Sequence, residues 1–318
     1  MNKEIIPVYI FSGFLGSGKT TLLNNLINDA KSKGLKPAVI LNEVGDVNVE
    51  GALVGTDTPL AEILGGCICC SLKGDISTEL VQLVQQHRPD VIWIESTGIA
   101  MPLELIDGVT EASLYERVAL ASIVTVVDCR HLLDRVRIGT GKTFRLMKEQ
   151  IAAADLIVLN KADLVQTLEL DELRSYIDIW NPYASSKITV KAQLDMECLV
   201  QGQGSNSKRI SEHDHKAHHD HDHKAHHEHD HVHSVTYFLN RSIDSQAFEL
   251  FLKRLPEGIY RAKGIVTFSD TASQFLFQYA YRESDFMRIS PQGKVQEVAI
   301  FIGENFSKQQ LLEQLDQL

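Results

Sequence analysis

The chain has 318 residues, of which 44% are hydrophobic and 23% charged, and these values exclude a wholly disordered or collagen-like protein. Lysine and arginine number 31 against 42 aspartate and glutamate, so the formal net charge of −11 disfavours nucleic acid and anionic lipid as partners. The longest apolar runs, Ile5 to Phe11 and Ala121 to Val127, are far shorter than the roughly 20 residues that span a bilayer. We therefore expect a cytoplasmic protein without membrane segments, built as one large and one small domain.

Residues 1–195 alternate between short apolar runs and longer helical patterns. The runs are Val8 to Phe11, Ala38 to Leu41, Val91 to Ile94, Ser122 to Val127 and Leu156 to Leu159. Because the runs lack polar alternation and helices separate them, they indicate a mostly parallel sheet covered on both faces. Helical spacing predicts two of the covering helices, through Leu22, Leu23, Leu26 and Ile27 and through Ile76, Leu80, Leu83 and Val84. We expect a doubly wound α/β domain.

The strongest motif, G-F-L-G-S-G-K-T at residues 13–20, matches G-x-x-x-x-G-K-S/T between the first run and the first helix. In such a loop the backbone N–H groups curl around phosphate oxygens, a lysine neutralises the β and γ phosphates, and a hydroxyl ligates Mg²⁺. The alternative is a glycine turn with a chance lysine. The residues that we predict to bind the nucleotide here are Gly13, Gly16, Ser17, Gly18, Lys19, Thr20 and Thr21.

The run Val91 to Ile94 ends at Glu95-Ser96-Thr97-Gly98. A carboxylate at a strand end can hold a Mg²⁺-bound water near the γ-phosphate, and a glycine N–H can approach that phosphate directly. We therefore predict that Glu95 holds the Mg²⁺-bound water and that Gly98 contacts the γ-phosphate, beside Lys19 and Thr20. An acidic residue in an ordinary strand-end turn is the alternative.

Five cysteines are too few for a secreted disulfide scaffold, and three of them, Cys67, Cys69 and Cys70, stand within four residues. Three such thiols can bind one soft or borderline cation if a fourth ligand comes from elsewhere. Glu43 and Asp46, which follow the second run, are candidate ligands at the same end of the sheet. The alternatives are packing as small hydrophobes, which suits Cys129 and Cys198, and redox chemistry.

A second motif, Asn160-Lys161-Ala162-Asp163, directly follows the run Leu156 to Leu159. The Asp163 carboxylate can accept two N–H bonds from the N1 and exocyclic amine of guanine, whereas adenine offers no such donor pair. N-K-x-D alone could instead cap the next helix. Its position at the end of a later strand predicts guanine binding by Asn160, Lys161 and Asp163.

The composition changes between residues 196 and 233, where Gln201 to Ser207 has no apolar residue and an imperfect eight-residue repeat follows. This segment predicts a flexible linker. Neutral imidazoles bind Zn²⁺, Ni²⁺, Co²⁺ and Cu²⁺, so its histidines predict metal binding without naming the metal. A solvated linker that binds metals incidentally is the alternative. The histidines are His213, His215, His218, His219, His221, His223, His226, His227, His229, His231 and His233.

Ordered patterns return after the linker. The run Val235 to Leu239 precedes a helix through Phe248, Leu252 and Leu255. The elements after that helix are the runs Ile265 to Phe268, Phe275 to Tyr279 and Val298 to Ile302, and a last helix with Leu311, Leu312 and Leu315. This order predicts a small α+β domain of split-βαβ type over residues 234–318, with its final strand and helix in the reverse of the usual order.

Together the phosphate loop, Asn42-Glu43-x-Gly45, G-G-C-I-C-C at residues 65–70, E-S-T-G and N-K-A-D resemble the CobW-like family of P-loop GTPases. That family is related in architecture to the metal-insertion GTPases of urease and hydrogenase maturation. The resemblance is dense over residues 1–195, whereas residues 235–318 are similar only in the order and position of their elements.

The resemblance implies a metallochaperone, in which GTP hydrolysis is coupled to binding of a metal, usually zinc, and to its delivery to a metal-requiring client protein of unknown identity. It implies phosphate binding by residues 13–20, phosphate sensing by Glu95 and Gly98, guanine binding by residues 160–163 and metal binding by the C-x-C-C thiolates. Relatives often carry a carboxylate where this chain has Leu41, so the fourth ligand must be Glu43, Asp46, water or a partner's group.

Three alternatives stay open: a cobalt-handling GTPase of cobalamin biosynthesis, a non-enzymatic histidine-rich metal buffer, and a regulatory GTPase with structural cysteines. The expected cofactors are GTP, Mg²⁺ and Zn²⁺, with Co²⁺ or Ni²⁺ as further options, and a homodimer is a further expectation. The histidine-rich segment at residues 213–233, which we call the histidine tract, would act as a tethered metal reservoir.

Overall fold

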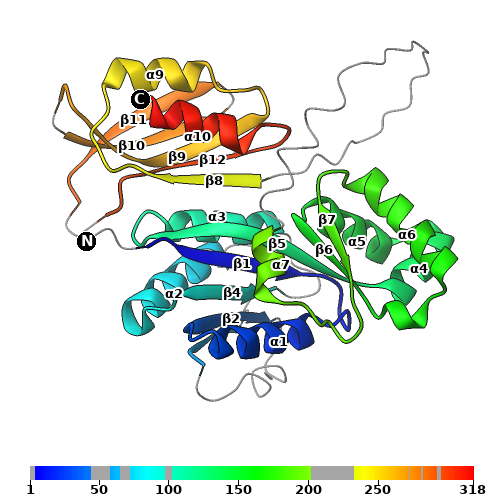
Figure 1. Cartoon of the computed structure of the whole chain (residues 1–318). Coiled ribbons are helices and arrows are strands. Elements are labelled where there is room, and N and C mark those ends of the chain that lie inside the picture. The colour runs from blue at the N-terminus through cyan, green and yellow to red at the C-terminus, as the bar shows by residue number, and fades with distance from the viewer. Residues whose placement is uncertain are drawn as a thin grey trace, which may run out of the picture.

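The structure, a computed structural model, describes residues 4–43, 58–64, 72–96, 102–201, 233–271, 273–280, 282–291 and 295–318. Two sheets organise these residues, each with its own helices (Figure 1). No helix in these ranges is both long enough and apolar enough to cross a membrane.

The first sheet has seven strands in the order β3-β2-β4-β1-β5-β6-β7, and every pair is parallel. The strands are β1 (Ile6–Ser12), β2 (Pro37–Glu43), β3 (Leu60–Leu64), β4 (Val91–Glu95), β5 (Val118–Asp128), β6 (Leu156–Asn160) and β7 (Ser185–Ile188). All five predicted runs are strands. We did not predict the two edge strands, β3 and β7, because each is short and contains polar residues, so neither forms a continuous apolar run.

Helices cover both faces of this sheet, which confirms the doubly wound α/β prediction. The helices are α1 (Lys19–Ser32), α2 (Leu72–His87), α3 (Pro102–Ala112), α4 (Cys129–Ile138), α5 (Lys142–Ala152), α6 (Thr167–Trp180) and α7 (Met196–Gln201), with a 3₁₀ turn at Ala162–Leu164. One core joins α1 to the face that carries Tyr9 and Phe11, and another joins α2 and α3 to the face that carries Val8 and Ile10. All eight residues that we used to predict the first two helices are buried.

The predicted linker begins too early. Residues 196–201 form α7, whose Met196 and Leu199 are buried in the same core as α1. Six residues are too short for a helical period to stand out from a polar surrounding sequence, which is why the pattern suggested a linker from residue 196. The rest of that segment up to residue 232 lies outside the described residues, and it includes all of the tract histidines except His233, where β8 begins.

The second sheet is antiparallel, with the order β11-β10-β9-β12-β8. Its elements are β8 (His233–Phe238), α9 (Ser245–Lys253), β9 (Ile259–Phe268), β10 (Ser273–Ala280), β11 (Glu283–Ile289), β12 (Val298–Gly303) and α10 (Lys308–Asp316). Because β12 lies between β8 and β9, the unit β8-α9-β9 is the predicted split βαβ, and the last strand precedes the last helix as predicted. We did not predict β11, in which exposed and half-buried residues alternate.

The two faces of the second sheet have different neighbours. Helices α9 and α10 cover one face, on the upper side in Figure 1, and share a core with Phe277 and Phe301. The other face carries Phe238, Ile265, Val298 and Ile300. These residues cluster with Leu114 of the first unit, by which we mean the parallel sheet and its helices; the antiparallel sheet and its helices are the second unit. The Arg117 guanidinium lies 4.6 Å from the centre of the Phe238 ring, and Arg261 Nη1 lies 3.1 Å from Asp107 Oδ1.

This contact lies near the beginning of β5, because Arg117 directly precedes that strand and Leu114 lies four residues before it. The second unit therefore docks near the amino-terminal ends of the parallel strands, and the predicted nucleotide residues follow their carboxyl-terminal ends.

Candidate nucleotide site

The predicted phosphate loop joins β1 to α1. Its glycines adopt backbone angles that other residues rarely adopt, with φ of 134° at Gly13 and 106° at Gly18. A Cβ on Gly13 would lie 2.2 Å from the Val126 carbonyl oxygen, and one on Gly18 would lie 2.4 Å from Asn160 Nδ2. The loop can therefore follow this path only with glycine at both positions.

Two polar side chains of the loop are buried. Lys19 Nζ donates to the Gly13 carbonyl at 2.9 Å, so the ammonium is held within the loop. The Ser17 hydroxyl is buried and has no hydrogen-bond partner among the described residues. A buried cation beside an unsatisfied hydroxyl suits an anionic ligand such as a phosphate group.

The predicted metal-binding oxygens meet between α1 and the end of β4. Thr20 Oγ1 donates to Glu95 Oε1 at 2.9 Å, and Glu95 is 2% exposed. Hydroxyl and carboxylate oxygens are the ligands that Mg²⁺ prefers, so this pair fits the ion. Gly98, which we predicted to act beside Glu95, lies outside the described residues.

Asn160 connects the phosphate loop to a second loop. Its Nδ2 donates to the Ser17 carbonyl at 2.8 Å, while its Oδ1 accepts from the Ala192 N–H at 2.8 Å. Asn160 is buried, so both hydrogen bonds are shielded from water. Asn160 therefore holds two loops together on the side of the site that is predicted to bind guanine, which we call the base side.

Lys161 is the second bridge to the phosphate loop. Its Nζ donates to the Gly16 carbonyl and to Asp128 Oδ2, each at 2.7 Å. Asp128 ends β5 and also caps α4, because its Oδ1 accepts from the His131 N–H at 3.0 Å. Sequence reasoning missed Asp128, although a carboxylate at a strand end was the same signal that selected Glu95.

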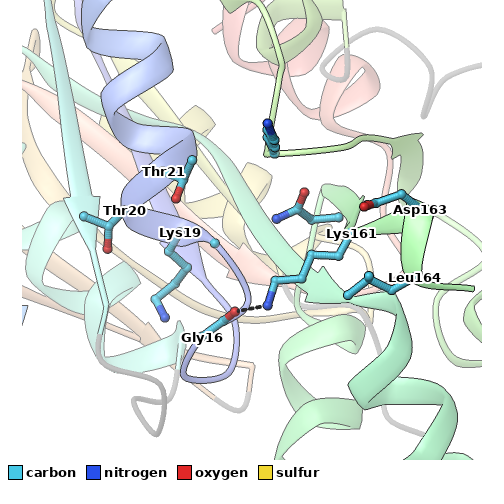
Figure 2. A pocket seen from close by; sticks show the side chains of 10 residues that line it. Gly16, Lys19, Thr20, Thr21, Lys161, Asp163 and Leu164 are labelled. Atoms are coloured by element: carbon cyan, nitrogen blue, oxygen red, sulfur yellow. Dashed lines mark hydrogen bonds between the residues drawn. The ribbon is translucent and has the colours of Figure 1, made fainter.

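Most of the predicted nucleotide residues line one pocket of about 500 Å³, within the usual size range of small-molecule sites, whereas Gly13 and Ser17 do not line it. In Figure 2, Lys19, Thr20 and Thr21 lie on one side, Asp163 and Leu164 lie on the other, and Lys161 reaches Gly16 between them. The lining residues are Gly16, Gly18, Lys19, Thr20, Thr21, Asn160, Lys161, Asp163, Leu164 and Lys191. The predicted phosphate-binding and base-binding residues thus face the same cavity.

Lys191 belongs to a turn that sequence reasoning missed. The Gln193 N–H donates to the Val190 carbonyl at 3.4 Å, and the two central residues, Lys191 and Ala192, have φ of 54° and 52°. Turns with positive φ at both central positions usually carry glycine, asparagine or aspartate. Each such residue costs roughly 1–3 kcal/mol in backbone strain, so surrounding contacts must hold this turn. The Lys-Ala pair carried no turn signal.

Most of the predicted metal ligands lie outside the described residues: Cys67, Cys69, Cys70, Asp46 and the tract histidines before His233. Glu43 ends β2, and its backbone is the register partner of Leu64, three residues before Cys67. In the described part of the chain, no three histidine, cysteine, aspartate or glutamate residues gather into a metal site.

Cys129 and Cys198 pack as predicted. Cys129 is fully buried in the core between α4, α5 and α6, and Cys198 packs against the α1 core. Burial, followed by the charge of Asp128, raises the pKa of the Cys129 thiol to about 12. The thiol therefore stays protonated and behaves as a small apolar side chain.

Two family descriptions match the chain. "CobW/HypB/UreG, nucleotide-binding domain" matches residues 7–186, and "Cobalamin synthesis protein cobW C-terminal domain" matches residues 232–318. The chain belongs to the CobW/HypB/UreG family. In this CobW/HypB/UreG protein, the nucleotide-binding match contains the phosphate loop, Glu95 and residues 160–163, and it ends just before the turn at Lys191.

Named relatives of this family member support the same grouping. Zinc-regulated GTPase metalloprotein activator 1 of Dictyostelium discoideum is 32% identical over 66% of this chain and 51% of its own length. Zinc chaperone CobW of Sinorhizobium sp is 30% identical over 68% of this chain and 70% of its own length. Zinc chaperone YjiA of Escherichia coli is 26% identical over 96% of both chains. The match thus spans about half of the Dictyostelium protein and nearly all of YjiA.

Proposed function

We propose that the chain is a Mg²⁺-dependent GTPase that binds Zn²⁺ as cargo and transfers it to a metal-requiring client protein. The observation that carries this proposal is the pocket in which Lys19 and Thr20 face Asp163, in a chain of the CobW/HypB/UreG family. Relatives named as zinc chaperones supply the choice of cargo.

The phosphate end of the pocket would bind and activate GTP. Lys19 is held in the loop by the Gly13 carbonyl and would turn its ammonium toward the β and γ phosphates. Phosphoryl transfer depends mainly on positioning and on stabilising negative charge, which a fixed lysine and the loop N–H groups supply.

Thr20 and Glu95 would hold Mg²⁺, with Thr20 as a direct ligand and Glu95 through a bound water. When bound, Mg²⁺ neutralises charge on the β and γ phosphate oxygens. The Glu95 carboxylate has the further effect of orienting the Thr20 hydroxyl, because it accepts that hydrogen bond.

The base end would select guanine. Asp163 lines the pocket across from Lys19 and would accept hydrogen bonds from the N1 and exocyclic amine N–H groups of guanine. Asn160 and Lys161 would act mainly on the loops, because their side chains donate to Ser17 and Gly16 carbonyls.

The zinc cargo site would be built by Cys67, Cys69 and Cys70, with Glu43 or Asp46 as a further ligand. Strands β2 and β3 are parallel neighbours, so the segments that follow Glu43 and Leu64 leave the same edge of the sheet as the phosphate loop. Nucleotide state and thiolate geometry would therefore be coupled, and the histidine tract would raise the local metal concentration.

The test is a Zn²⁺ competition titration against a chromophoric chelator, on a variant that lacks residues 211–232 and so keeps β8 intact, with Mg²⁺ and either GDP or a non-hydrolysable GTP analogue. We expect the two affinities to differ about tenfold, which is roughly 1.4 kcal/mol of coupling. Equal affinities would contradict the coupled cycle. The same titration with Co²⁺ tests the cobalt alternative.

Cysteine variants provide the matched control. Replacing Cys67, Cys69 and Cys70 together by serine should remove the tight site, whereas Cys198→Ser should leave it, because Cys198 packs against the α1 core. Tight binding that survives the triple replacement would favour a regulatory GTPase. Strong metal binding without GTP hydrolysis would favour a metal buffer.

A further inference from the structure

We propose that Asn25, on α1, is a positioning residue for guanine because it holds the turn at Lys191 and Ala192 on the base side of the pocket. This inference rests on the proposed GTP binding. It adds a residue that no nucleotide motif contains and that does not line the pocket itself.

The contact joins segments that are far apart in the sequence. Asn25 Nδ2 donates to the Ala192 carbonyl at 2.9 Å and to the Lys191 carbonyl at 3.2 Å. Both acceptors belong to the residues with positive φ. A side-chain amide has two N–H donors, so one asparagine can satisfy both carbonyls.

The turn needs these two hydrogen bonds, which we call the Asn25 clamp, because Lys191 and Ala192 are not glycine. If the clamp is removed, relaxation to negative φ would redirect the Lys191 side chain, which lines the pocket. Relaxation would also move the Ala192 N–H away from Asn160 Oδ1, to which it donates at 2.8 Å. The effect would reach the base side of the pocket through both residues.

Helix α1 connects this clamp to the phosphate loop. The helix begins at Lys19, so the same element carries the phosphate-binding lysine and, less than two turns later, Asn25. One turn beyond Asn25, Asp29 Oδ2 accepts from the Met196 N–H at 2.9 Å. Residues 191–196 are therefore attached to α1 at two points, and α1 sets the spacing between the phosphate and base ends.

The expected effect of Asn25→Ala is specific. Two neutral hydrogen bonds are lost, so we expect the Kd for GDP to rise about tenfold, which corresponds to roughly 1.4 kcal/mol. Since the base is bound in the same way before and during hydrolysis, the KM for GTP should rise by a similar factor, with the change in KM exceeding that in kcat. ADP cannot use the guanine contacts, so its Kd should change little.

The experiment titrates the full chain with a fluorescent GDP analogue and measures GDP and ADP affinities by displacement, at a temperature where every variant is folded by circular dichroism. Asn25→Asp keeps the side-chain shape but removes both donors, and it should weaken GDP binding at least as much as Asn25→Ala. Asn28→Ala is the matched control, because Asn28 is exposed on the same helix.

A selective loss of GDP affinity in both Asn25 variants supports the inference. Unchanged GDP affinity overturns it, and so does an equal loss for GDP and ADP, which would indicate general damage to the fold. Failure of the unmodified chain to bind GDP would instead overturn the proposed function, and the inference with it.

Discussion

The two sheets differ in what lies at their ends and faces. The parallel sheet buries both faces under helices, places Glu95 and Asn160 at the ends of its strands, and places Lys19 at the end of the loop that follows β1. The antiparallel sheet buries one face under α9 and α10 and the other partly against the first unit. A parallel sheet gathers the loops of several strands at one edge, so its chemistry concentrates there, whereas neighbouring antiparallel strands end at opposite edges.

This comparison separates two kinds of side chain. In the nucleotide site, polar groups such as Asn160 and Lys161 connect loops across the pocket. In the second unit, Phe248 is fully buried at the centre of the core. The centre of its ring lies 5.0 Å from the centre of the Phe277 ring, in an edge-to-face arrangement. Substitutions should therefore affect nucleotide binding in the first region and stability in the second.

The largest expected effect is on stability. Phe248→Ala removes an aromatic side chain from the core of the second unit, and such changes cost about 3–5 kcal/mol. Chemical unfolding should show this loss, while GDP affinity at 25 °C stays unchanged. Leu250→Ala, at a position 46% exposed on the same helix, is the control. A parallel fall in GDP affinity would show that the two regions are not separate.

The next effect is on catalysis. Lys19→Ala removes the buried ammonium of the phosphate loop, and losing one such group commonly costs a factor of about 100 to 1,000 in rate. Phosphate release from GTP measures the loss, with Lys253→Ala on α9 as the control. Hydrolysis that persists in the Lys19 variant would mean that the pocket is not the active site.

A smaller effect is expected at the Lys161 bridge. Asp128→Asn removes the charge that pairs with Lys161 but keeps an oxygen that can accept from the His131 N–H and cap α4. The pair is partly buried, so we expect a threefold to tenfold rise in the Kd for GDP, of order 1 kcal/mol. Asp134→Asn, in an exposed pair with Arg130, should have no effect. Equal results for both variants would remove Asp128 from the site.

The smallest effect concerns pH. The Met196 N–H and then Lys33 lower the pKa of Asp29 below its ordinary value of 3.8, so the folded state favours the charged carboxylate. Asp29 therefore adds stability that is complete well above pH 3.8 and is lost as the pH falls through the lowered folded value. Urea unfolding of the unmodified chain and Asp29→Asn should differ near pH 7 and converge toward pH 3. A difference that persists at low pH would contradict this assignment.

The sequence by itself determined the parallel sheet, the split βαβ unit and most of the nucleotide pocket. Continuous apolar runs report burial on both faces, and Gly13, Lys19 and Asp163 belong to motifs whose spacing is set by phosphate and base chemistry. These signals are local, so they can be seen without knowing which segments meet.

Only the tertiary structure decided the contacts between distant segments. Helix α7 is too short to show a period, and its burial against α1 appears only when the chain is folded. Asp128 and Asn25 gain their roles from Lys161 and from the turn at Lys191 and Ala192, which are 33 to 167 residues away. The positive φ values of that turn are imposed by such contacts, because neither lysine nor alanine favours them by itself.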